Sequence, residues 1–503
     1  MNLNDDFFRA AGNAFNLRIP KAKALSYRKS FVSSLDSEEA LRFIESLDET
    51  RNITHSILLD KNDIDSLERA LSSLDKYILL VFQLLDSVSK SETEVTLDCQ
   101  LCFSWRGSLC QESEKRTECS DIIFEVLMSL MTKACIHHRI GALQVAADAN
   151  RVPVGAQHMR ICAGIMCRLE SLIKIWIPTS NSMKRPQELH TSTCKSMTLY
   201  FMGMAQKMAV IKAVQKGGTT PSLLLKLSVE VSACMGEALK DFVPSSEYST
   251  DFSASDFPVM IAFDRELFAS LSLYFFALDA YAKEDIGVSI AFCRLALDKL
   301  NVQNGKKYNC FQPGLPPLNL KGRSHLLLGV ENLKAVISFK LNSIEHDNKL
   351  VYFQAVPVSP NLPALPAGIK ATEAIPFDRP ESVKLIEFKY NPKRAPSQGL
   401  GGILGSIFED WGSVQDRVPG NQKNKTIEGS IQIAGDAVEG GANTDNIAFG
   451  RGATLSEEVR NIDAACDTRD VQRINQDRTH TALSDEEFAR RLQRQLDMGQ
   501  GEV

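Results

Sequence analysis

The most regular feature of the chain is a helical spacing of apolar residues between about residue 40 and residue 350. In one stretch, apolar residues recur at intervals of three and four, which places them on one helix face: Ile64, Leu67, Leu71, Leu74, Ile78, Val81 and Leu85. The same rhythm returns in residues 123–134 and 224–238. Because each apolar stripe must be buried by a neighbour, the pattern predicts long helices packed side by side.

Residues 266–300 predict a helical hairpin. Their apolar pattern is interrupted once, between Lys283 and Gly287, and the segment on each side is long enough for a helix. The arrangement is similar to a tetratricopeptide hairpin, although the sequence shows only one clear copy of such a repeat.

One stretch departs from the helical rhythm. Between Val95 and Trp105, apolar and polar residues alternate, which is typical of a half-buried strand, so we expect a small sheet beside the helices. Cys99 and Cys102 form a CxxC pair within this stretch. Positions three apart in a strand point to opposite faces, so the two thiols would diverge, and we expect no metal site.

The last third of the chain changes in composition. Prolines cluster after residue 352 and exclude a helix, so this part is expected to be an extended segment laid across a surface. Twelve of the 29 glycines lie between residues 399 and 452, where aromatic residues are scarce. Such a segment cannot bury enough surface to become ordered, so we place a domain boundary near residue 395 and expect a disordered tail after it.

This boundary gives three expected units. A helical domain covers residues 1–395, a flexible glycine-rich linker covers 396–482, and a C-terminal amphipathic helix covers 483–498. The linker contains a short amphipathic segment at 401–414, whose apolar side would dock on the domain, bind a partner or touch a membrane, although its acidic neighbours argue against anionic lipid. The apolar side consists of Ile403, Leu404, Ile407, Phe408 and Trp411.

Composition and charge narrow the functional classes. The 503 residues are 44% hydrophobic and 24% charged, which excludes a collagen and a wholly disordered chain. The net charge of −5 provides no basic field for nucleic acid or an anionic membrane. The 12 cysteines are scattered, the chain begins without a signal-peptide pattern, and no apolar stretch reaches the ~20 residues that span a bilayer. We therefore expect a cytoplasmic protein.

No motif in the sequence indicates catalysis. We find no G-x-S-x-G elbow, Walker loop, HExxH pair or kinase signature. The glycine-rich residues 399–405 do not follow a strand of a βαβ unit, so nucleotide binding is disfavoured. We expect no catalytic residue and no cofactor, and an enzyme is the disfavoured class.

Several stretches share their order and spacing with one known family. Residues 346–357 read HDNKLVYFQAVP and lead into LPALPAGIKATEAIPFD; LCFSWRGSL lies at 101–109, AQHMRICAGIMCRLESL at 156–172, and a further match covers 204–239. Together they resemble the Bro-type domain of Alix-like, endosome-targeting proteins over about residues 15–395. The resemblance implies a mainly α fold, a curved (banana-shaped) helical solenoid with a tetratricopeptide-like core and a small antiparallel β-sheet.

The resemblance also implies a partner. In this family an apolar groove accepts the C-terminal amphipathic helix of an ESCRT-III filament subunit, by helix-in-groove recognition. The matched motifs assign Leu223 and Leu227 to this groove, and Tyr352 to a surface tyrosine. Ala209 stands where the family often has a large aromatic residue, which would leave the groove shallower or less tightly closed. The alternative is that Leu223 and Leu227 are core residues, because the same spacing occurs in any buried helix.

The end of the chain predicts a separate helix. Ser484 and Glu487 form a capping box, and an apolar stripe follows that has no core of its own to cover it. The string EEFARRLQ is similar to an inverted ubiquitin-interacting motif, in which Ala489 would be the central contact, flanked by Phe488 and Leu492. Docking onto the body of the protein and pairing with another helix remain the alternatives.

The sequence therefore predicts an ESCRT-associated endosomal adaptor or regulator in multivesicular body sorting, recruited to endosomes through protein partners, with ubiquitin as a second candidate partner. The coiled-coil domain and proline-rich tail of longer Alix-like proteins are absent from this sequence, which favours a short single-domain form. The alternative function is a helical scaffold with a different amphipathic-helix partner and no ESCRT role, for which Ala209 is the main argument.

Overall fold

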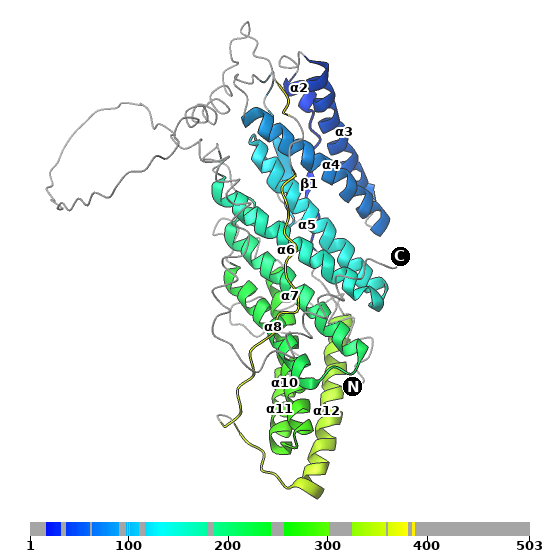
Figure 1. Ribbon diagram of the computed structural model, residues 1–503, viewed down its shortest axis with the longest axis vertical. Coiled ribbons are helices and arrows are strands. Elements are labelled where there is room, and N and C mark those ends of the chain that lie inside the picture. The colour runs from blue at the N-terminus through cyan, green and yellow to red at the C-terminus, as the bar shows by residue number, and fades with distance from the viewer. Residues whose placement is uncertain are drawn as a thin grey trace, which may run out of the picture.

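Long helices stacked side by side along one axis make up most of the computed structural model (Figure 1). It describes residues 17–31, 37–60, 63–89, 97, 99, 101–109, 116–176, 178, 185–242, 256–300, 324–358, 361–380 and 385–387. The expected tail, including 401–414 and 483–498, lies outside these residues. The α-helices are α2 (Tyr27–Phe31), α3 (Glu38–Asp60), α4 (Ile64–Ser89), α5 (Ile122–Ala147), α6 (Val152–Ile175), α7 (Thr191–Lys216), α8 (Pro221–Asp241), α10 (Asp256–Ala282), α11 (Ile286–Leu300) and α12 (Ser324–Asp347).

The predicted apolar stripes form the helix contacts. In α4, Leu67, Leu74 and Val81 from the predicted stripe are buried, with at most 2% of their surface exposed. From α3 onward, each of these helices packs against its neighbours along the chain, so one continuous core runs through the stack. Short turns join some of them: η2 (Ala149–Arg151) precedes α6 and η3 (Gln187–Leu189) precedes α7. The prediction of a mainly helical, curved solenoid is confirmed.

The helical hairpin predicted for residues 266–300 is formed by α10 and α11. Its turn is tight, since Glu284 adopts the left-handed conformation with φ of 63° and the Asp285 amide donates to the Ala280 carbonyl at 2.9 Å. The rings of Phe276 and Phe292 stack with centroids 4.1 Å apart across the two helices. These contacts close the hairpin into a tetratricopeptide-like unit.

A three-stranded antiparallel sheet lies beside the helices in the order β1 (Lys21–Ala22), β2 (Phe103–Arg106) and β3 (Thr117–Cys119). The sheet confirms the prediction, but β2 begins later than the alternating pattern from Val95 indicated. Among the described residues of that stretch, Leu97, Cys99 and Leu101 precede the strand. The ladder is short because its partner strands have only two and three residues with which to pair.

The proline-rich residues form an extended strap, here defined as residues 353–358 and 361–380. In Figure 1 the strap runs back along the stack from the end of α12 toward α4. Its backbone bonds to α8 and α6 in turn, where the Ile369 amide donates to the Lys226 carbonyl at 3.2 Å and the Ile375 amide donates to the Arg160 carbonyl at 3.1 Å. The strap thus ties together helices that are far apart in sequence.

Two glycines let the strap lie close to the helices. A Cβ atom on Gly164 of α6 would sit 1.7 Å from the Ile375 carbonyl oxygen, and one on Gly287 of α11 would sit 2.1 Å from the Ala355 carbonyl oxygen. Such distances are impossible for real Cβ atoms. Both positions therefore need glycine for the approach of another backbone rather than for their own conformation.

The first prediction concerns Gly164. Gly164→Ala is expected to push the strap away from α6 and to lower the free energy of unfolding by about 1–3 kcal/mol, the usual cost of overpacking. Chemical denaturation measures the loss, and amide exchange at Ile375 reports the displaced strap. The control is Gly236→Ala in α8, where the nearest atom to a new Cβ is Arg265 Cδ at 3.8 Å, so no loss is expected. Equal losses in both variants would contradict the prediction.

Candidate partner-binding site

The three residues that the resemblance assigns to a partner groove lie on two adjacent helices. Ala209 is in α7, and Leu223 and Leu227 are one turn apart in α8. The start of α8 fixes the place of Leu223, because the Thr220 side chain accepts a hydrogen bond from the Leu223 amide at 3.4 Å. Pro221 occupies the first turn, where a helix needs no amide donor.

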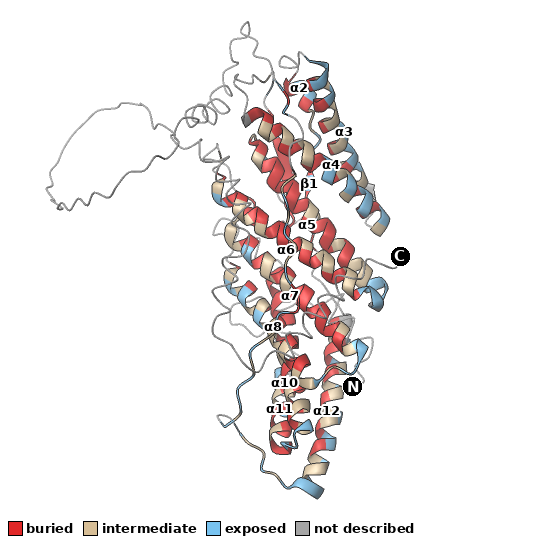
Figure 2. Cartoon of the chain, viewed as in Figure 1, coloured by how far each residue is buried: buried red, intermediate tan, exposed pale blue. Residues whose placement is uncertain are grey.

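All three side chains are buried. The exposed fraction is 0% for Ala209, 3% for Leu223 and 0% for Leu227, and red segments mark this part of α7 and α8 in Figure 2. The structure therefore places them in the core, the alternative that the sequence left open. A partner helix could contact Leu223 or Leu227 only if the atoms that cover them moved aside.

One turn of α7 holds three different parts of the fold together. Ala209 faces the core, while Lys207 forms a buried ion pair with Asp264 of α10, with its Nζ 2.9 Å from Oδ1 and 3.0 Å from Oδ2. Desolvation lowers the pKa of Lys207 and raises the pKa of Asp264, and the attraction between the two charges opposes both shifts. The pair fixes α7 against α10 beside the candidate groove.

Gln206 on the same turn binds the strap through both atoms of its amide. Its Oε1 accepts from the Ala371 amide at 2.8 Å, and its Nε2 donates to the Ile369 carbonyl at 2.8 Å. Nε2 also lies 3.4 Å from the Leu227 carbonyl. The strap is therefore coupled, through one side chain, to the turn of α8 that carries Leu227.

Sequence reasoning did not identify Gln206, Lys207 or Asp264. The sequence did indicate that Lys207 and Asp264 need buried partners, because each is a charged residue in an otherwise apolar helix. What the sequence could not give was the partner, because 57 residues separate Lys207 from Asp264.

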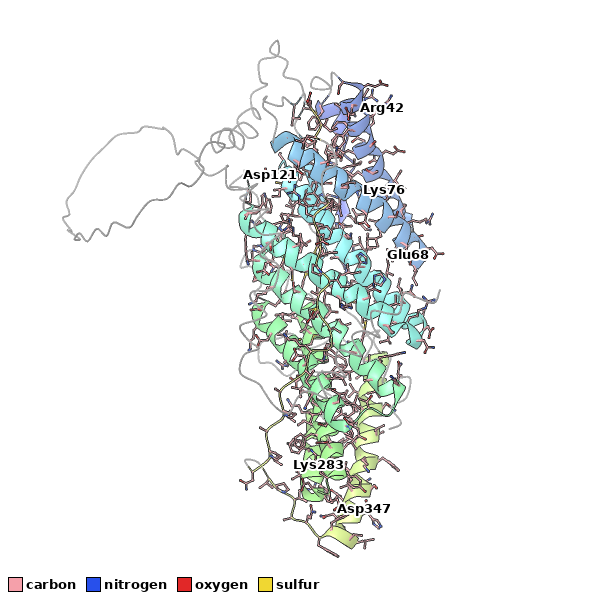
Figure 3. The ribbon with its side chains drawn as sticks, viewed as in Figure 1. Arg42, Glu68, Lys76, Asp121, Lys283 and Asp347 are labelled. Carbon is pink, nitrogen blue, oxygen red and sulfur yellow. The ribbon has the colours of Figure 1, made fainter. Side chains whose placement is uncertain are left out.

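Tyr352 lies at the far end of the stack. It belongs to η4 (Asn348–Tyr352), a π-helical turn that continues α12, and 37% of its surface is exposed. Asn348 braces this turn, because its side chain donates to the Gln354 carbonyl and accepts from the Gln354 amide, both at 2.9 Å. Lys283 and Asp347 lie at the same end of the molecule (Figure 3). The expected surface tyrosine is thus accessible; Phe488, Ala489 and Leu492 lie outside the described residues.

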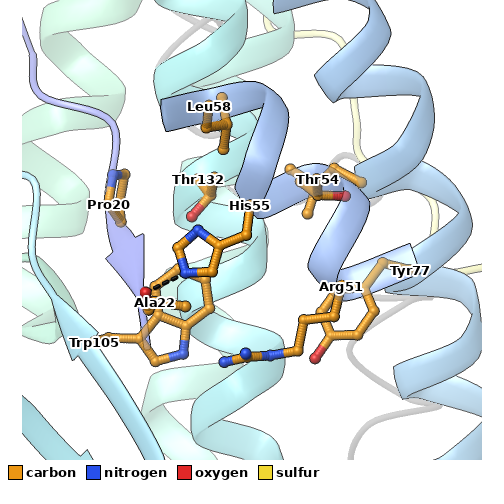
Figure 4. A pocket seen from close by; sticks show the side chains of 10 residues that line it. Pro20, Ala22, Arg51, Thr54, His55, Leu58, Tyr77, Trp105 and Thr132 are labelled. Atoms are coloured by element: carbon orange, nitrogen blue, oxygen red, sulfur yellow. Dashed lines mark hydrogen bonds between the residues drawn. The ribbon is translucent and has the colours of Figure 1, made fainter. Parts of the chain in front are cut away.

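A small cavity opens near the N-terminal end of the stack, between α3, α4 and the sheet (Figure 4). Its wall includes Arg51, Tyr77 and Trp105, and all three side chains donate to the buried carboxylate of Glu125, at 2.9, 2.6 and 2.6 Å. Burial would lower the pKa of Arg51, but Glu125 and two tyrosines outweigh it and raise that pKa. The cluster joins α3, α4, α5 and β2, and within it the Nη2 atom of Arg51 is buried without a hydrogen-bond partner.

Three histidines lie between α5, α6 and α7, of which His137 and His138 are buried and His158 is half-buried. His137 Nδ1 lies 3.0 Å from His158 Nδ1, and the ring of His138 packs against Tyr200 and Phe201. Burial lowers the pKa of His137 and of His138 to about 3, with smaller contributions from neighbouring positive charges, and burial alone lowers that of His158 to about 4. All three are therefore neutral in the folded protein at pH 7.

The described part of the chain shows neither a metal site nor a membrane-spanning helix. No three histidine, cysteine, aspartate or glutamate side chains in it are arranged to hold a metal ion, and Cys99 and Cys102 are both exposed. No helix among the described residues is long and apolar enough to cross a membrane.

Comparison with known families identifies the fold. A family model described as a BRO1-like domain matches residues 26–396, which is most of the chain and includes every α-helix of the stack. The chain belongs to the BRO1-like domain family. The resemblance found in the sequence is thereby confirmed.

Solved BRO1 structures agree with this assignment. The chain matches an ALIX BRO1–CHMP4C complex with a TM-score of 0.57 at 16% identity, covering 74% of this chain and 98% of that one. A structure described as the basis for endosomal targeting by the Bro1 domain gives a TM-score of 0.55 at 16% identity, with 72% and 93% coverage. Identities this low establish the fold alone.

One curated BRO1 relative was also found. The pH-response regulator protein palA/RIM20 of Pyricularia oryzae (strain 70-15 / ATCC MYA-4617 / FGSC 8958) is 22% identical over 288 residues, which is 56% of this chain but 31% of the relative. The chain therefore matches about a third of the length of that protein.

Proposed function

We propose that this BRO1-domain chain is a non-enzymatic, ESCRT-associated adaptor that binds the C-terminal amphipathic helix of an ESCRT-III subunit in multivesicular body sorting. The observation that carries the proposal is the match to the BRO1 domain solved with CHMP4C, an ESCRT-III subunit, over nearly the whole of that domain. The adaptor is cytoplasmic and reaches endosomes by binding a protein helix already present there, since its charge of −5 offers no field to hold an anionic membrane.

The proposed contact surface is the α7–α8 pair, with Leu223 at its edge. Leu223 lies on the first turn of α8 and retains 3% exposure, whereas Leu227 has none. A partner helix inserts an apolar side chain beside Leu223 after a small movement of the atoms that cover Leu223. Leu227, one turn further along α8, packs beneath this position. Ala209, which is fully buried, lies on α7 next to this surface.

The second prediction tests this surface. Leu223→Ala is expected to weaken binding of an ESCRT-III C-terminal helix peptide about tenfold or more, because it removes an apolar wall of the site. Isothermal titration with the full chain measures the affinity. The matched control is Leu341→Ala in α12, a second buried leucine with 9% exposure, which is expected to lose comparable stability and to keep the affinity.

Two outcomes would overturn the proposal. One is that the wild-type chain does not bind the peptide at about 1 mM. The other is that a folded Leu223→Ala protein, verified by its circular dichroism and cooperative melting, binds as tightly as wild type. An equally tight complex with an unrelated amphipathic helix would instead support the alternative of a scaffold with no ESCRT role.

Ubiquitin binding by the terminal helix is a further part of the proposed function. Its support is the sequence pattern in which Ala489 is flanked by Phe488 and Leu492. NMR titration of labelled ubiquitin with the full chain tests it. Shifts on the apolar patch of ubiquitin that disappear in Ala489→Arg would support the role, and an absence of shifts at about 1 mM would remove it.

A further inference from the structure

Prolines recur every third residue where the strap leaves the end of the stack. They stand at positions 357, 360, 363 and 366. A polyproline II helix has three residues per turn, so this spacing places the prolines in one row along such a helix. The hydrogen bond from the Asn361 amide to the Val358 carbonyl, at 2.8 Å, marks a turn inside the row. The continuous extended part is therefore residues 362–368.

Burial along this segment follows the same period of three only in part. In the first row Val356 and Leu362 pack partly against the core, whereas Leu365 of the same row is 39% exposed. The next row includes Pro363, which is exposed, and Pro366, which is half-buried. The third row is exposed throughout its described length: Val358, Asn361, Ala364 and Ala367. The segment thus presents an edge of proline and small apolar residues to solvent.

The segment is held at both ends by hydrogen bonds to the rest of the fold. At one end, the Gln354 side chain accepts from the Gly287 amide at 3.0 Å and donates to the Glu284 carbonyl at 2.8 Å. At the other end, Gln206 and α8 hold Ile369. Between these anchors, no described residue of the strap forms a backbone hydrogen bond with a helix. Fixed ends keep the segment extended, which reduces the entropy lost when a partner binds it.

The chemistry of the segment selects the kind of partner. No charged residue occurs from Leu350 to Ile369, so nothing here would attract nucleic acid, an acidic peptide or an anionic membrane. Apart from Asn361, its exposed side chains are apolar, with exposed fractions of 75% for Phe353, 70% for Val358 and 39% for Leu365. The prolines exclude an amphipathic helix that could lie in a lipid interface.

We propose that strap residues 362–368 display a polyproline II ligand to a domain with an aromatic-lined groove, of the kind found in SH3, WW and EVH1 domains. The sequence Leu362-Pro363-Ala364-Leu365-Pro366 contains two apolar–proline pairs three residues apart, the spacing that such grooves read. The groove contacts the edge formed by Pro363 to Pro366. Phe353 and Val358, just before it, provide additional apolar anchors. This surface is distinct from the α7–α8 site, although Gln206 anchors the end of the segment beside the turn that carries Leu227.

The test uses the full chain and a panel of purified SH3, WW and EVH1 domains, with affinities measured by fluorescence anisotropy. At least one domain is expected to bind. The double variant Pro363→Ala/Pro366→Ala is expected to weaken that complex about tenfold or more. The matched control is Pro376→Ala, an exposed proline in the hydrogen-bonded part of the same strap, which should keep the affinity. Leu223→Ala should keep it as well.

Three results would each overturn the proposal. The first is that no domain of the panel binds at about 1 mM, and the second is that the double variant binds as tightly as wild type. The third is that a peptide of residues 355–369 binds while the full chain does not. The last result would show that the segment is not accessible on the protein. Phosphatidylcholine vesicles serve as a further probe. Co-sedimentation that depends on Pro363 and Pro366, without binding to any domain, would assign the segment to lipid and reject the protein partner.

Discussion

Asp264→Ala is expected to lower the free energy of unfolding by about 3–5 kcal/mol. The substitution leaves the Lys207 amine in the core without the carboxylate that lies 2.9 Å from it. An ammonium group at that depth pays a large desolvation cost, so the fold must either neutralise it or open around it. Urea denaturation measures the loss. It should exceed that of Asp279→Ala in the same helix, because the Asp279 pair with Lys283 is at the surface.

A second variant separates the charge from the packing. In Lys207→Met/Asp264→Leu both charges are replaced by apolar groups of similar size, so most of the loss should be recovered. Peptide binding reports whether α7 keeps its position, because Lys207 is two residues from Ala209 of the proposed contact surface. The double variant is expected to keep the affinity for the ESCRT-III peptide if α7 stays in place. A loss below about 1 kcal/mol in Asp264→Ala would contradict a buried, fully charged pair.

Acidification is expected to destabilise the protein by up to about 4 kcal/mol between pH 7.5 and 5.5 through His137, His138 and His158. In the unfolded chain these side chains bind protons below about pH 6.5. In the folded protein they do so only near pH 3 for His137 and His138 and near pH 4 for His158. The unfolded state therefore binds more protons over this interval. Their contribution is fully present above pH 6.5 and is lost as the pH falls toward 4.

Denaturation at several pH values measures this slope. His138→Phe should reduce the destabilisation by about a third, because phenylalanine fits beside Tyr200 and Phe201 and binds no proton. Met166→Leu, at a fully buried position of α6 that does not titrate, should leave the slope unchanged. A slope that is the same in His138→Phe and in wild type would reject the role of this histidine.

Helices were the part of the fold that the sequence revealed most directly. Apolar stripes such as that of α4 and the break between α10 and α11 are local, since the residues that form each signal lie within one or two turns. The family resemblance rested on the same kind of information, namely short motifs in a fixed order. The strand from Val95 was too long in prediction because its length depends on β1 and β3, which come from other parts of the chain.

The candidate site was less predictable. Leu223 and Leu227 have the spacing of both a groove and a core, and local sequence cannot distinguish the two. Their burial was decided by how α7, α8 and α10 pack and by the strap that Gln206 holds beside them. The role of Pro363 and Pro366 likewise emerged only when the anchors at Gln354 and Ile369 were known.

By itself, then, the sequence determined the helical class, the hairpin, the extended strap and the family, because each depends on the periodicity or the order of residues near one another in the chain. Tertiary structure alone decided which apolar residues remain accessible, which buried charges are paired and which surface the strap leaves open. These properties depend on contacts such as that between Arg160 and Glu373, which are 213 residues apart. No local pattern fixes such a contact, because its energy arises only when the whole stack is assembled.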